Sequence, residues 1–112
     1  MQLLKADGLR TSNPKLSRVL LTNIDEAQLT NNEKELYQYL TAHNTFINGN
    51  VLEANNLLNQ LAKSSKNIDI QVRTLGTLLS VYAISNDWLN ALQTANLLND
   101  YLKTELDPTI VE

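Results

Sequence analysis

His43 is the only histidine of the 112 residues, and its side chain could most readily exchange a proton near neutral pH. It lies between Tyr39 and Phe46 at helical spacing, on an apolar stripe. A general base needs an orienting partner and a substrate cleft, and the sequence supplies neither. We therefore expect a packing or groove-lining role for His43 and no catalytic residue in the chain.

The sequence contains no residue pattern typical of a metal site or of a catalytic nucleophile. The chain has no cysteine, and one histidine cannot build a zinc site without further ligands. The carboxylates Glu33, Glu35 and Glu53 are spread over the surfaces of expected helices, and we interpret the first two as part of a solvated face. The serines lack a nucleophile-elbow glycine pattern, and the three glycines form no phosphate-binding loop. We expect no metal, no cofactor and no enzymatic activity.

Charge and hydropathy limit the partners. The net charge is −3 and the charges are interspersed, so no basic stripe is available to nucleic acid. The longest apolar runs have only a few residues, so we expect no direct membrane insertion by this segment. A chain without cysteine fits the cytoplasm and the periplasm alike, and the compartment stays open.

Six helices must position any binding residues. Apolar residues recur at helical spacing, and capping or turn residues separate the segments. The predicted helices cover residues 3–10, 14 to about 24, about 31–47, 51 to about 62, about 69–84 and 88 to about 103. Gly76 lies inside the fifth of these, where a glycine is costly. We expect it to permit close packing against the third helix.

A weak internal repeat of about 37 residues relates these helices in pairs, with Ser17, Ala54 and Ala91 at equivalent places. A small residue followed by larger apolar ones at helical spacing suits the second helix of a hairpin, because the first helix can approach closely. The predicted fold class is all-α, an α-α superhelix of about three degenerate helical hairpins. The units are about 1–29, 30–67 and 68–105, in one domain of a larger protein. A freestanding helical bundle is the alternative.

Two segments, residues 36–61 and 72–98, resemble tetratricopeptide repeats. Gly49 before the run Val51-Leu52-Glu53-Ala54 is similar to the helix-turn-helix signature of that family. In the second segment the matching positions are large residues, then a turn, then a small residue: Leu75, Leu78, Tyr82, Trp88 and Ala91.

The chain also departs from the family pattern. Asn86 and Asp87 stand where a turn with glycine is usual, Ala95 replaces a large residue, and the terminal proline of each unit is missing. The resemblance implies that ligands lie along a concave surface made by the first helices of the hairpins. By this register Tyr39, His43, Arg73 and Ser80 would face a groove suited to an extended protein or peptide segment.

A narrower similarity joins part of the chain to the sensory region that precedes GGDEF-type cyclic-dinucleotide synthase domains. It rests on the run Ser12-Asn13-Pro14-Lys15-Leu16, on the acidic connector Ile24-Asp25-Glu26 and on the paired helices after Asn31. The similarity implies an input module of a bacterial signalling protein, usually on the periplasmic side, with a diguanylate cyclase as its parent. No catalytic motif of that enzyme class occurs in the chain.

The sixth predicted helix is apolar on two sides. The expected inward stripe consists of Trp88, Ala91, Ala95, Leu98 and Leu102, and a second set lies off it: Leu89, Leu92, Leu97 and Tyr101. A second apolar face is stable only when another surface packs against it. We therefore expect this face to pair with another copy or with a following helix. Asp107 and Pro108 could begin that helix.

The predicted function is a non-catalytic protein-interaction or sensory module. A homo-oligomerisation element and a small-molecule receptor are the alternatives.

Overall fold

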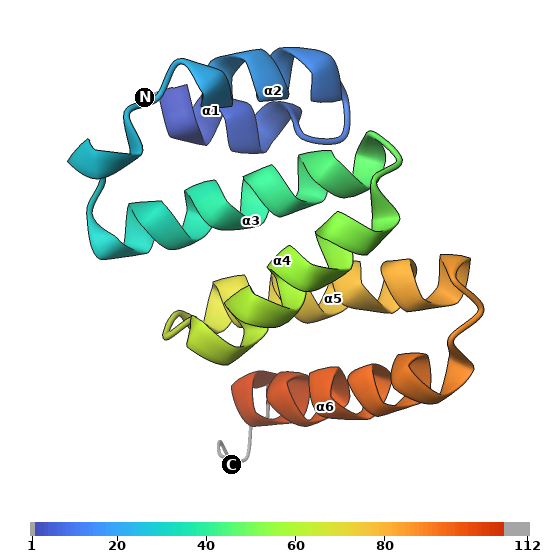
Figure 1. Cartoon of the computed structure of the whole chain (residues 1–112). Helices are drawn as coiled ribbons and strands as arrows, with labels where there is room; N and C mark the ends of the chain where they lie inside the picture. Colours follow the sequence, from blue (N-terminus) through green and yellow to red (C-terminus); the bar gives the residue numbers. More distant parts are fainter. Residues whose placement is uncertain (1, 107–112) are drawn as a thin grey trace.

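The computed structural model describes residues 2–106, with side chains up to residue 103. The expected helix start at Asp107 and Pro108 lies outside the described residues. The chain is all-α, as predicted, and no strand occurs within residues 2–106 (Figure 1). The elements are α1 (Gln2–Leu9), α2 (Pro14–Thr22), the 3-10 turn η1 (Glu26–Gln28), α3 (Asn31–Ile47), α4 (Val51–Ser64), α5 (Ile68–Ile84) and α6 (Trp88–Leu106). The six predicted helices are confirmed, and η1 is an addition.

Consecutive helices pack together in pairs. The closest partners are α1 with α2, α3 with α4 and α5 with α6, and the helices follow one another as stacked layers (Figure 1). Helix α4 also packs on α5, while α3 contacts α1 on one side and α5 on the other. Helix α3 is therefore the central element of the molecule, and the residues that it carries are the ones most enclosed by neighbours.

Side-chain caps fix the starts of three helices. The side chain of Asn13 accepts a hydrogen bond from the backbone N–H of Leu16, and that of Asn67 caps α5 in the same way. Thr30 and Glu33 form a reciprocal capping box at the start of α3. Each cap satisfies N–H groups that have no partner inside the helix, which explains why the helices begin at these residues.

Two hairpin turns share one backbone geometry. Gly49 has φ 93° and Asn86 has φ 58°, in the left-handed region that glycine adopts freely and asparagine tolerates. In both turns the next residue donates its N–H to the carbonyl five residues earlier: Asn50 to Thr45 at 3.1 Å, and Asp87 to Tyr82 at 2.9 Å. Both helices thus end in a Schellman-type motif. Asn86 therefore has the same left-handed backbone conformation at the helix end as Gly49, 37 residues earlier.

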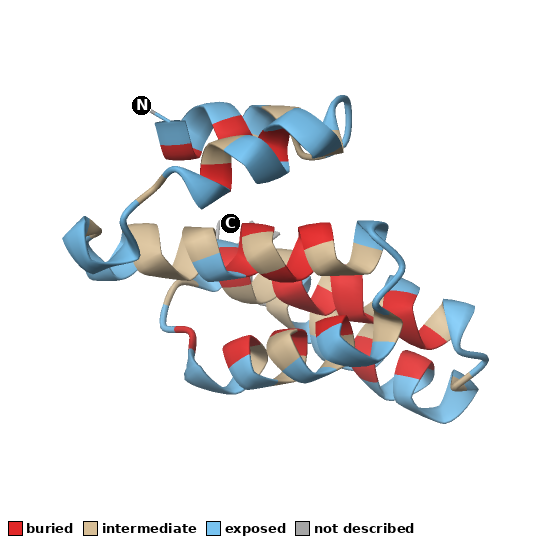
Figure 2. Cartoon of the chain, turned by 45° about the horizontal axis from the view of Figure 1, so that its top comes forward, coloured by how far each residue is buried: buried red, intermediate tan, exposed pale blue. Residues whose placement is uncertain are grey.

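The three equivalent small residues lie in the core. Ser17 and Ala54 have no exposed surface, and Ala91 is 7% exposed. The Ser17 hydroxyl donates to the carbonyl oxygen of Ala6 in α1 at 2.8 Å, so its burial leaves no unpaired polar group. The buried residues lie on the sides of the helices that face one another (Figure 2). Close packing at these positions agrees with the repeat read from the sequence.

The prediction that Gly76 lets α5 pack closely against α3 is wrong. A Cβ atom added to this glycine would meet no heavy atom within 4 Å. The long side chain of Tyr39 reaches from α3 to Thr77, the neighbour of Gly76, with its hydroxyl 3.0 Å from the Thr77 hydroxyl. A large side chain, and not a close backbone contact, fills this part of the boundary between α3 and α5.

Candidate functional site

The four residues expected to line a peptide groove differ in their surroundings. Tyr39 and His43 are 4% and 9% exposed, Arg73 is partly buried, and Ser80 is exposed. The structure brings Tyr39, His43 and Arg73 together where α1, α3 and α5 meet, while Ser80 lies outside this cluster. Because α1 packs over α3, the two rings offer little surface to a ligand. Partner binding through these residues stays a prediction.

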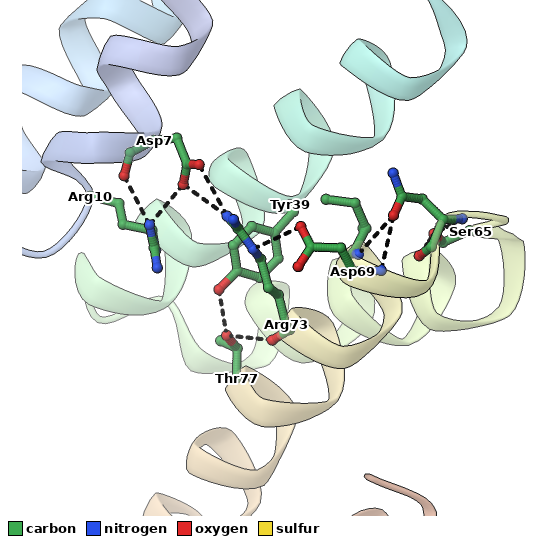
Figure 3. Close-up of polar contacts among 9 residues, drawn as sticks. Asp7, Arg10, Tyr39, Ser65, Asp69, Arg73 and Thr77 are labelled. Carbon is green, nitrogen blue, oxygen red and sulfur yellow. Dashed lines mark hydrogen bonds and ion pairs between the residues drawn. The ribbon is translucent and has the colours of Figure 1, made fainter. Parts of the chain in front are cut away.

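Arg73 is held by two aspartates from different helices. Its Nη1 donates to Oδ1 and Oδ2 of Asp7 at 2.9 and 3.1 Å, and its Nε lies 3.3 Å from Oδ2 of Asp69. Arg10 adds a second cation on Asp7, with 2.7 Å between Nη1 and Oδ1 (Figure 3). Burial opposes the charged form of Arg73, but the hydrogen bonds and charge of Asp7 outweigh it, and the pKa of Arg73 is raised. These contacts tie α1 to α5.

Tyr39 belongs to the same cluster. The Thr77 hydroxyl donates to the carbonyl oxygen of Arg73 at 3.1 Å, and the Tyr39 hydroxyl is therefore the donor in its 3.0 Å bond with Thr77 (Figure 3). The rings of Tyr39 and His43 lie with centroids 6.0 Å apart and a tilt of 42°. This arrangement fixes the Tyr39 ring between two helices and satisfies its polar end, as expected of a buried tyrosine.

His43 is neutral near pH 7 in this environment. Burial lowers its pKa, the charge of Arg10 lowers it further, and the charge of Asp7 partly opposes the shift. Its buried Nδ1 has no hydrogen-bond partner in the described part of the chain. The surroundings of His43 fit a packing residue.

Glu35 has a structural role, and its interpretation as part of a solvated face is wrong. Its carboxylate accepts hydrogen bonds from the Ser65 hydroxyl at 2.5 Å and from the backbone N–H groups of Lys66 and Asn67 at 3.1 and 3.3 Å. Burial acts to raise the pKa of Glu35, but these hydrogen bonds and the charge of Lys66 outweigh it, and the pKa is lowered. Glu35 thus holds the loop between α4 and α5 onto α3. Contacts across 30 residues leave no local sequence signal.

The outer side of α6 carries the largest exposed apolar group of the described chain. Leu89, Leu92 and Leu97 are 68%, 59% and 47% exposed, in agreement with the second face expected for this helix. Two other parts of that expectation are wrong. Trp88 is 63% and Leu102 is 38% exposed, so neither belongs to the inward stripe. Tyr101, by contrast, packs against the core.

The reason is the rotation of α6 about its axis. The helix buries Ala91 and Thr94 and packs Leu98 on the core, so its inward stripe is centred on these positions. Trp88 and Leu92 are one helical turn apart along one exposed edge of this stripe, with Leu89 beside them. We call Trp88, Leu89, Leu92 and Leu102 the α6 face. Leu97 is also exposed, but it lies on the other edge of the buried stripe and is not part of this face.

Among the side chains described, those of residues 2–103, no three of histidine, cysteine, aspartate or glutamate come together as metal ligands would. None of the described helices combines the length and the hydropathy needed to cross a bilayer. No family model, no curated protein and no solved structure matches this chain in comparisons with known proteins.

Proposed function

We propose that the chain is a non-catalytic protein-interaction module of stacked helical hairpins, and that its partner at the α6 face is a second copy. The observation that carries the proposal is the exposure of Trp88, Leu89 and Leu92, each about two thirds open to solvent on one side of one helix. Large apolar side chains grouped in this way are typical of interaction sites. Tryptophan is also among the residues that contribute most to binding.

The α6 face is complementary to itself. Two antiparallel copies of α6 related by a twofold axis at Ala95 would place Trp88 against Leu102 of the other copy, since both residues lie on the stripe through Leu92 and Ala95. The same register would place Trp88 near the exposed Lys103, whose ammonium can lie on the indole ring. Antiparallel helices also bring opposite dipole ends together. Ala95 at the midpoint allows the two helices to approach closely.

The expected dimer is weak. Burying the α6 face would remove on the order of 400 Å² per copy from water, about half of the roughly 800 Å² per partner in a standard stable interface. We therefore expect a dissociation constant in the micromolar range, about 10 to 100 μM. An association of this strength responds to concentration, as a regulated contact must.

Two further parts of the proposal rest on the sequence resemblance. A superhelix of tetratricopeptide-like hairpins is supported by the buried small residues at the 37-residue spacing and by the common turn at Gly49 and Asn86. An input role in a bacterial GGDEF-type signalling protein is supported by the similarity around Ser12 to Leu16. Self-association of such an input region would bring two output domains together.

Light scattering coupled to size exclusion tests the proposal over protein concentrations from 5 to about 500 μM. The wild-type mass should rise toward that of a dimer. Leu92→Glu should keep the chain monomeric at every concentration. Leu52→Glu is the matched control, because Leu52 is 77% exposed on α4, away from the α6 face. A wild-type chain that stays monomeric, or equal effects of the two substitutions, would refute the pairing.

A further inference from the structure

A cleft runs between α2 and α4, with α3 as its floor. It consists of three adjoining hollows of about 240, 210 and 290 Å³. Arg18, Asn44 and Asn48 line both the first and the second hollow, and Tyr37 and Thr41 line both the second and the third. Shared walls make the three hollows one elongated cleft. Residues of α6 line none of them.

Asn44 is an unusual residue in this cleft. It lies on α3, is only 7% exposed, and lines two of the hollows. Its Nδ2 has no hydrogen-bond partner among the described residues. Buried amides are nearly always paired, because water is lost without compensation otherwise. The unpaired Asn44 amide in the wall of the cleft is therefore a group that calls for a partner from outside the described chain.

Positive and negative side chains lie at different ends of the cleft. Lys15 and Arg18 lie at the end near the start of α2, and neither forms an ion pair within the described part of the chain. Glu26 lies at the opposite end, and Glu53 lies on the α4 side of the middle hollow. The first end therefore attracts an acidic group, and the rest of the cleft does not.

The floor can pair with a peptide backbone. The hydroxyls of Thr41 and Thr45 donate to the carbonyl oxygens of Tyr37 and Thr41 in their own helix, each at 2.9 Å. Their lone pairs remain free to accept from N–H groups. The floor therefore offers hydroxyl acceptors one helical turn apart on α3, with Asn44 between them in the wall of the cleft. An extended chain presents N–H groups at every second residue on one side, and these can donate to such acceptors.

We propose that this cleft binds an extended peptide that carries an acidic side chain. The carboxylate lies at Arg18 and Lys15, and an apolar side chain lies on Tyr37 and Leu57 in the third hollow. Asn44 and Tyr37 are seven residues apart on α3, about 10 Å, which an extended peptide spans in about three residues. The site is separate from the α6 face, so peptide binding and self-association can fail independently.

Fluorescence anisotropy tests the peptide site in the Leu92→Glu background. The probes are fluorescein-labelled hexapeptides of alanine and serine with one glutamate and one leucine two, three or four positions away. A second set has glutamine in place of glutamate. We expect at least one glutamate peptide to bind below 1 mM, and the glutamine set to bind about fivefold or more weakly.

Arg18→Ala should weaken the glutamate peptide about fivefold and leave the glutamine peptide unchanged. Lys5→Ala removes the same charge from the exposed surface of α1 and should leave both unchanged. The proposal is overturned if no peptide of the set binds, or if Arg18→Ala has no larger effect than Lys5→Ala. It is also overturned if N-acetylglutamate amide binds as tightly as the hexapeptide, since the site would then take a small ligand.

Discussion

Replacing Gly76 by alanine should stabilise the protein. Glycine in the interior of a helix costs about 0.5 to 1 kcal/mol relative to alanine, because the unfolded glycine has more conformations to lose. A methyl group at Gly76 would lie in open space, since no heavy atom is within 4 Å of its expected position. Gly76→Ala should therefore raise the free energy of unfolding by about 0.5 to 1 kcal/mol.

Thermal unfolding followed by circular dichroism measures this effect. A domain of 112 residues gains roughly 2.1 cal/mol/K per residue on unfolding, so the expected rise in Tm is about 2 to 4 °C. Urea unfolding of the same variant should shift the midpoint upward at an unchanged slope. Both measurements belong at protein concentrations of a few micromolar, where self-association contributes little.

Gly49→Ala is the matched control. It is the same substitution, and it too would meet no atom within 4 Å. However, Gly49 has φ 93°, a conformation that strains any residue with a Cβ atom. Gly49→Ala should lower the free energy of unfolding by about 1 kcal/mol or more. A fall in Tm for Gly76→Ala would show that α5 packs closely at this position and would refute the reasoning.

Three further predictions concern the polar contacts. Asp7→Ala removes the carboxylate shared by Arg10 and Arg73 and should lower the free energy of unfolding by about 1 to 2 kcal/mol in urea titrations, with a less than additive effect in an Arg73→Ala background. Glu35 has a lowered pKa, so its contribution to stability is present above the unfolded pKa and is lost as pH falls through the folded value; Glu35→Gln should flatten the stability profile below pH 4.5. His43 also has a lowered pKa, so protonation favours the unfolded chain, and stability should fall as pH decreases below about 6.5; His43→Leu should reduce this fall between pH 7.5 and 5.5.

Local patterns were enough to predict the helices. The capping box of Thr30 and Glu33 and the proline after Asn13 act within four residues, and each marks a helix start in the structure. Ser17, Ala54 and Ala91 are each followed by larger apolar residues at helical spacing in their own helix, and all three are buried. Such signals are local because the hydrogen bonds and caps of a helix join residues close in sequence.

Features that depend on distant neighbours could not be predicted in this way. Trp88 and Ala91 both suit an inward stripe on a helical wheel, but the rotation of α6 is set by what α5 covers, and Thr94 is buried while Trp88 is exposed. The contact between Asp7 and Arg73 spans 66 residues. The sequence shows that these side chains are charged, but their spacing along the chain does not indicate which of them form ion pairs.

The cluster around Arg73 also bears on where a partner can bind. Asp7 and Arg10 belong to the first hairpin, and their bonds to Arg73 hold α1 over α3, where Tyr39 and His43 are covered. Opening this surface to a peptide would break the paired charges and expose the rings, and both changes cost free energy. The α6 face and the cleft between α2 and α4 need no such rearrangement. For this reason we place both proposed binding sites away from the groove that the family resemblance implies.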